Sequence, residues 1–141
     1  MGRGFFICWI MSALLMYFAF YIWHGILLTD FYRISYPKTL LMLFSSFTYL
    51  VISLVNYFVF HRKWLNKRIP ALFWRGIATG IIVGGSLFMI TSVIGISFST
   101  EKNLFSLLVD FSWQIFEQSI GGITIALVEY ILIHSEAENH S

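Results

Sequence analysis

Two acidic residues and an amide lie within a long apolar segment near the C-terminal end of the chain. Asp110, Gln114 and Glu117 are spaced by four and three residues in the segment 104–133. On a helix, this spacing places the three side chains on one face. A carboxylate costs a few kcal/mol to place inside a membrane, so it usually faces a polar partner or water. We therefore expect any chemistry of this protein to involve this face.

The end of the first apolar segment offers partners for these carboxylates. His24 and Asp30 lie at the end of residues 5–28, which should be at the same depth as the beginning of 104–133. His24, Asp110 and Glu117 could therefore come together. One imidazole and two carboxylates can relay protons or hold a divalent metal ion. The alternative, which we favour, is a buried hydrogen-bonded pair of His24 and a neutral Glu117 that fixes helix packing. Whether a metal ion binds is left open, and no cofactor is expected.

Arg75 and Glu129 predict an ion pair between the apolar segments 71–98 and 104–133. Both residues should lie at a similar depth near the cytoplasmic ends of their segments. Either side chain could instead extend to the membrane surface. We interpret this pair as a structural contact between the two helices and not as part of a reaction.

Three glycines form a seam on the third apolar segment. Gly76, Gly80 and Gly84 recur every four residues, which lets another helix approach closely where lipid supplies no hydrophobic driving force. Packing against a neighbouring helix of the same chain is the favoured interpretation. A dimerisation face or a sliding surface in a transporter is the alternative.

The second apolar segment carries its own polar residues. Ser45, Tyr49 and Asn56 approximate one stripe of residues 39–60. They can hydrogen-bond to neighbouring helices, each bond being worth about 0.6 kcal/mol. Alternatively, they line a small polar cavity together with the acidic face of 104–133.

The composition determines which kind of protein can carry these residues. Of the 141 residues, 58% are hydrophobic and 11% are charged, and the mean hydropathy is +0.79. About a quarter of the residues of a water-soluble domain are charged, so lipid must cover much of this chain. Four apolar segments are each long enough to cross a bilayer as a helix. They comprise residues 5–28, 39–60, 71–98 and 104–133.

These segments predict an all-α integral membrane protein, folded as a four-helix up-down-up-down bundle. It forms one transmembrane domain over residues 1–141 and ends in a short polar tail, 134–141. Basic residues concentrate between 61 and 75 and at Arg3, which predicts cytoplasmic N and C termini in the plasma (inner) membrane. The lipid bilayer is the expected partner. The basic residues thus act as a topology signal, and no nucleic acid partner is expected.

Residues 23–25, Trp-His-Gly, end the first apolar segment, and residues 110–113, Asp-Phe-Ser-Trp, open the last one. These Trp-x-Gly and Asp-x-x-Trp elements resemble a bacterial family of small four-span inner-membrane proteins. Members commonly carry an acid a few residues before the first tryptophan, where this chain has Phe20 and Tyr21. The family has no assigned activity. The resemblance implies a four-helix inner-membrane fold in which one structural unit links the first and last helices: Trp23, Gly25, Asp110 and Trp113.

Three kinds of function are compatible with this sequence. The first, which we favour, is a non-enzymatic membrane module with a polar site between the first and last helices. It would work as an accessory subunit of a larger membrane complex or as a small homo-oligomer. The second is a transporter or channel for protons, a cation or a small polar solute, working as a homodimer because four spans rarely enclose a pathway alone. The third is a membrane enzyme that acts on a lipid or a quinone.

Overall fold

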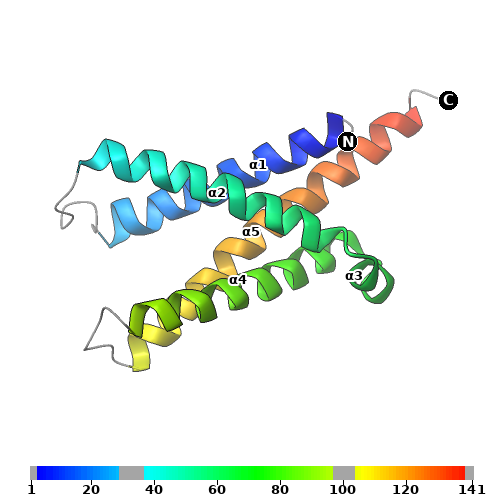
Figure 1. Cartoon of the computed structure of the whole chain (residues 1–141). Helices are drawn as coiled ribbons and strands as arrows, with labels where there is room; N and C mark the ends of the chain where they lie inside the picture. Colours follow the sequence, from blue (N-terminus) through cyan, green and yellow to red (C-terminus); the bar gives the residue numbers. More distant parts are fainter. Residues whose placement is uncertain (1–2, 29–36, 97–103, 139–141) are drawn as a thin grey trace.

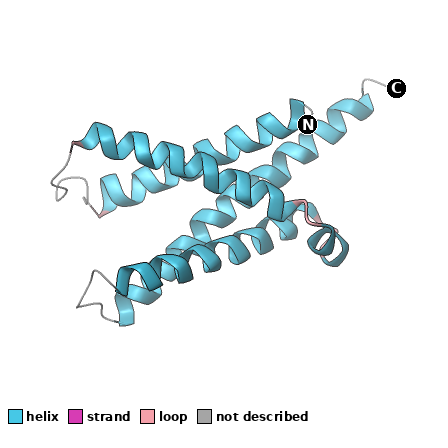
Figure 2. Cartoon of the chain, viewed as in Figure 1, coloured by secondary structure: helices cyan, strands magenta, loops and turns pink. Residues whose placement is uncertain are grey.

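A computed structural model describes residues 3–28, 37–96 and 104–138 of the chain, and its regular secondary structure is entirely helical there (Figures 1 and 2). Four stretches are long and apolar enough to cross a membrane. This confirms the prediction of an all-helical chain with four such helices. The elements in chain order are α1 (Arg3–Phe20), η1 (Tyr21–Leu27), α2 (Lys38–Phe60), α3 (Lys63–Arg68), α4 (Leu72–Ile96) and α5 (Leu104–Glu138).

Three features of these elements differ from the sequence prediction. Helix α5 continues to Glu138, so part of the expected polar tail is helical. The basic connection contains the short helix α3, whose Leu65 is buried. The first span ends in η1, a π-helix with a wider turn, and just beyond it the Leu28 N–H donates to the Trp23 carbonyl at 2.8 Å, five residues back. Such turns interrupt the regular α-helical ladder and change the direction of the side chains around them.

The helices form two arms that meet near α3 and diverge towards the opposite end of the molecule (Figure 1). One arm contains α1, η1 and α2, and the other contains α4 and α5. Helix α1 begins and α5 ends at the same end of the molecule as α3, whereas η1 ends and α2 begins at the divergent end. Helix α5 packs most extensively against α4 and then against α1, so it joins the two arms.

The glycine seam of α4 lies against α5. A Cβ atom added at Gly76 would lie 2.7 Å from the Gly122 carbonyl oxygen, and one at Gly84 would lie 2.8 Å from the Gln114 carbonyl oxygen. A Cβ at Gly80 would overlap the backbone of Ser119. Small residues therefore allow the two backbones to touch. The structure agrees with the favoured interpretation of the seam, packing within one chain.

Large apolar side chains cover the outward faces of all four long helices. Phe18, Phe47, Met89 and Ile131 are examples, one from each long helix, and all are exposed. The buried apolar core is small and lies towards the α3 end, where Cys8, Phe60, Ile125 and Ala126 cluster. An apolar exterior around a small interior is the arrangement that lipid solvation requires.

Candidate functional site

Polar side chains are buried where α1, α2 and α5 meet. On α2, the spacing of Tyr49, Ser53 and Asn56 by four and three residues directs these side chains inward. We call the group formed by these three with Ser12, Glu117 and Gln118 the polar centre; all six are buried. Two of its hydroxyls bond to backbone carbonyls of other helices. Ser12 donates to Gly121 at 3.1 Å and Ser53 donates to Trp9 at 2.6 Å.

An amide pair connects the two arms inside the polar centre. The Asn56 side chain donates to Oε1 of Gln118 at 2.9 Å and lies 3.3 Å from the sulfur of Met16. Both amides are fully buried. Among the described residues, Asn56 Oδ1 and Gln118 Nε2 have no hydrogen-bond partner. The pair therefore fixes the position of α2 on α5 while retaining one unused donor and one unused acceptor.

Glu117 is the buried carboxyl of the polar centre, with 2% of its surface exposed. Its polar neighbours are the hydroxyl of Tyr49 and the indole N–H of Trp113. Glu117 Oε1 and Trp113 Nε1 make no hydrogen bond of normal geometry within the described part of the chain. Both neighbours are hydrogen-bond donors, and a carboxyl can accept a hydrogen bond from either of them. The site is thus a buried carboxyl flanked by two aromatic hydrogen-bond donors.

Of the other residues of the predicted polar site, His24 lies in η1, and Asp110 and Gln114 lie on α5. His24 is half-buried in η1, and its ring lies 4.9 Å from that of Phe20. Asp110 is exposed and Gln114 is half-buried, whereas Asp30 lies outside the described residues. No group of three His, Cys, Asp or Glu residues able to hold a metal ion is found in the described ranges. The neighbours that the structure gives to Glu117 are Tyr49 and Trp113.

Arg75 and Glu129 each contact a partner other than the one expected. Glu129 accepts a hydrogen bond from Nε2 of His61. Arg75 donates to Oδ1 of Asn66, and its guanidinium lies 4.5 Å from the ring centre of Phe60. Within the described residues, no ion pair joins Arg75 to Glu129. His61 was not predicted as the partner of Glu129, although its place one residue after α2 puts it at the same end.

His61 uses both ring nitrogens. Nδ1 lies 2.9 Å from the Tyr57 carbonyl oxygen, and Nε2 faces Glu129. Burial alone lowers the pKa of His61, but the hydrogen bonds to Glu129 and to Tyr57, with the negative charge of Glu129, outweigh it. Arg75 opposes this shift, and the net result is a pKa above the usual value. An imidazole with two acceptors is fully hydrogen-bonded only when it is protonated.

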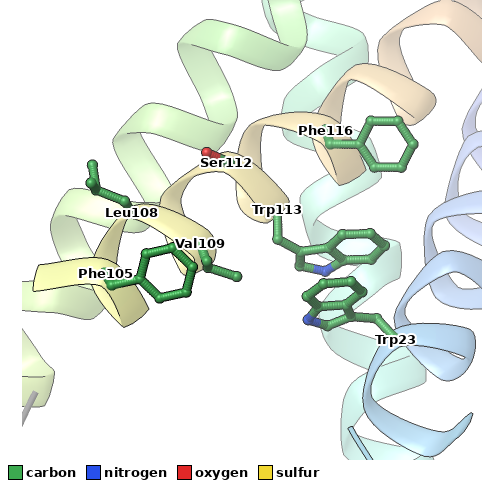
Figure 3. A pocket seen from close by; sticks show the side chains of 7 residues that line it. All are labelled: Trp23, Phe105, Leu108, Val109, Ser112, Trp113 and Phe116. Atoms are coloured by element: carbon green, nitrogen blue, oxygen red, sulfur yellow. The ribbon is translucent and has the colours of Figure 1, made fainter. Parts of the chain in front are cut away.

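An apolar groove lies on the outer surface between the two arms. The indoles of Trp23 in η1 and Trp113 in α5 stack face to face, with centroids 4.1 Å apart and planes 8° apart (Figure 3). Cavities of about 530 and 380 Å³ adjoin this stack, and both are lined by the two tryptophans and by Phe116. We call them together the tryptophan groove. Further lining residues on α5 include Phe105, Leu108 and Ser112.

Trp113 belongs to both features of the site. Its ring forms a wall of the tryptophan groove, while its N–H is buried beside Glu117. A ligand or helix in the groove would therefore contact a side chain that adjoins the polar centre.

The chain thus combines four helices long and apolar enough to cross a membrane with a buried polar centre and an apolar groove. No protein-family model, curated protein or solved structure matches the chain. Because function resides in sites and not in folds, its function is inferred from the residues above.

Proposed function

We propose that this chain is a non-enzymatic membrane module that associates laterally with a partner membrane helix or with a second copy of itself. It would lie in a bacterial plasma membrane as an up-down-up-down bundle. Both chain ends and α3 would be cytoplasmic, because α3 lies at the end of the molecule that carries the chain ends and is rich in Lys and Arg.

The observation that carries this proposal is the tryptophan groove. It lies between two arms that diverge at this end of the molecule, and its lining is almost entirely apolar. In a bilayer, helices associate by close packing and interhelical hydrogen bonds, since lipid is as apolar as they are. A groove on the lipid-facing surface supplies concave packing area for a neighbouring helix, and exposed Phe105 and Phe116 supply its rim.

The contact between Trp23 and Trp113 also supports the resemblance to small four-span bacterial proteins. These residues belong to the Trp-x-Gly and Asp-x-x-Trp elements, and they touch through their ring faces. The two elements would then be a structural unit that builds the groove.

The test is the mass of the native complex. The full chain is extracted in a mild detergent, and its native mass and co-purifying proteins are determined. We expect a homodimer or a stoichiometric complex, heavier than one chain of 16.4 kDa. A monomer with no associated protein, both in detergent and in nanodiscs, would contradict the proposal.

A second function, proton-coupled transport by a homodimer, is favoured by Glu117. Its carboxyl is buried, and Oε1 has no hydrogen-bond partner among the described residues. Such a carboxyl can bind and release a proton during transport. The test is proton flux into liposomes that contain the purified chain. Transport predicts flux that is lost in Glu117→Gln and retained in Asp110→Asn, whose parent side chain is exposed. Proton flux that persists in Glu117→Gln would exclude a proton relay through Glu117.

A further inference from the structure

Four cations lie close together at the end of the molecule that carries the chain ends. Arg62, Lys63, Lys67 and Arg68 lie in or next to α3, and all four are exposed. We call them the basic patch. Among the described residues, none of the four forms an ion pair with an acidic side chain. The patch therefore presents positive charge that no acidic side chain of the described ranges neutralises.

Helix α3 is held in one orientation. Leu65 is buried with 2% exposure, which fixes the face of α3 that is turned inward. Lys63 and Lys67 are one turn apart, and helical geometry places them on the face opposite Leu65. The Arg68 guanidinium lies 5.1 Å from the ring centre of Trp64. This cation–π contact holds the Arg68 side chain in position.

The position of α3 places the basic patch at the membrane surface. Helix α2 ends at Phe60 and α4 begins at Leu72, so α3 lies in a short connection between two spans. Trp64 in α3 and Trp74 in the first turn of α4 are 56% and 63% exposed. Exposed tryptophans next to span ends favour the headgroup region, where an apolar ring and a polar N–H are both solvated.

We propose that the basic patch binds the phosphodiester headgroup of an anionic phospholipid. Two lysines on one helix face supply point charges, and Arg62 and Arg68 supply guanidinium groups that can bind phosphate oxygens in a bidentate manner. This binding is separate from lateral association through the tryptophan groove, which lies between η1 and α5. Each cation near an anionic surface contributes roughly fivefold to affinity.

The experiment measures the lipid retained by the full chain. The protein is purified in detergent with mixed phosphatidylglycerol and phosphatidylcholine, and native mass spectrometry counts the bound molecules of each. The first variant combines Lys63→Gln with Lys67→Gln, which point away from Leu65. The second combines Arg62→Gln with Arg68→Gln. The matched control combines Lys38→Gln with Lys102→Gln, which removes the same charge at the first residue of α2 and two residues before α5 in the sequence.

We expect the wild-type chain to retain phosphatidylglycerol in preference to phosphatidylcholine. Each double variant should lose this preference by roughly 25-fold, while the control keeps it. Circular dichroism of each variant checks that its helices are intact. Equal retention of the two lipids by the wild type would overturn the proposal, as would a preference that both patch variants keep. Displacement of the lipid by inorganic phosphate at equal concentration would also overturn it.

Discussion

The ring faces of Trp23 and Trp113 are nearly parallel, 8° apart, and their centres are separated by 4.1 Å. This stack connects η1 with α5 at the end of the molecule where the two arms diverge. It is therefore both a contact between the arms and a wall of the tryptophan groove.

The energy of this stack is measurable by a double-mutant cycle. We expect Trp23→Leu and Trp113→Leu each to lower the free energy of unfolding, measured by titration with a denaturing detergent. Their coupling energy should be about 0.5–1.5 kcal/mol, the usual value for paired aromatic rings. Coupling near zero would show that the two rings do not stabilise each other.

The contact of α4 with α5 predicts different effects of substituting two glycines of α4. Gly80→Ala should lower the free energy of unfolding by about 1–3 kcal/mol, because its Cβ would overlap the backbone of Ser119. Gly85→Ala is the matched control, since a Cβ there would meet nothing within 4 Å. It should be neutral or slightly stabilising. Equal effects of the two substitutions in the same titration would contradict the packing of this seam.

The amide pair in the polar centre predicts a larger cost for single than for paired replacement. Asn56→Leu or Gln118→Leu should each cost about 1–3 kcal/mol, because each leaves the other amide buried without its partner. The double variant should recover part of this loss in the same unfolding titration. Strictly additive losses would indicate that the two amides do not interact.

The presence and approximate bounds of the four long helices could be predicted, because length and hydropathy depend on the sequence alone. The predicted segments 39–60 and 71–98 correspond to α2 and α4 within a few residues at each end. The close approach of the glycine seam to another helix was also predictable, since Gly76 and Gly80 lack the Cβ atoms that would prevent it.

The partners inside the site could not be predicted in the same way. They depend on how each helix is rotated and shifted against its neighbours. The sequence showed that Ser45, Tyr49 and Asn56 share one stripe of α2. The spacing of these residues could not show that Tyr49 would adjoin Glu117 or that Asn56 would bond to Gln118. The stacking of Trp23 on Trp113 depends likewise on the position of η1 relative to α5.

His61 predicts a pH-dependent contact between α2 and α5. Its pKa is raised in the folded state, above the value of about 6.5 for an unfolded chain. The stabilisation is therefore fully present below about pH 6.5 and is lost as pH rises through the folded-state pKa. We expect the thermal unfolding midpoint to fall between about pH 6 and about pH 8, by an amount equivalent to about 1 kcal/mol or less because the pair is partly exposed.

Two variants test the assignment to His61. His61→Gln should remove this part of the pH dependence. His134→Gln should preserve it, because no carboxylate pairs with the His134 ring within the described residues. An unchanged pH profile in His61→Gln would assign the effect to another group.

Lateral association through the tryptophan groove is tested most directly by site-specific crosslinking in membranes. Cys8 is the single cysteine of the chain. In a Cys8→Ala background, one new cysteine therefore carries the only thiol and is the only site that is labelled. Ser112→Cys places a thiol-linked photo-crosslinker in the groove. Met89→Cys places it on the exposed surface of α4 at a similar depth, since the neighbouring Phe88 packs against Phe111. We predict a discrete crosslinked product, a dimer or one partner protein, several-fold more abundant from Ser112→Cys than from Met89→Cys. Equal or undetectable products from the two positions would contradict association through this groove.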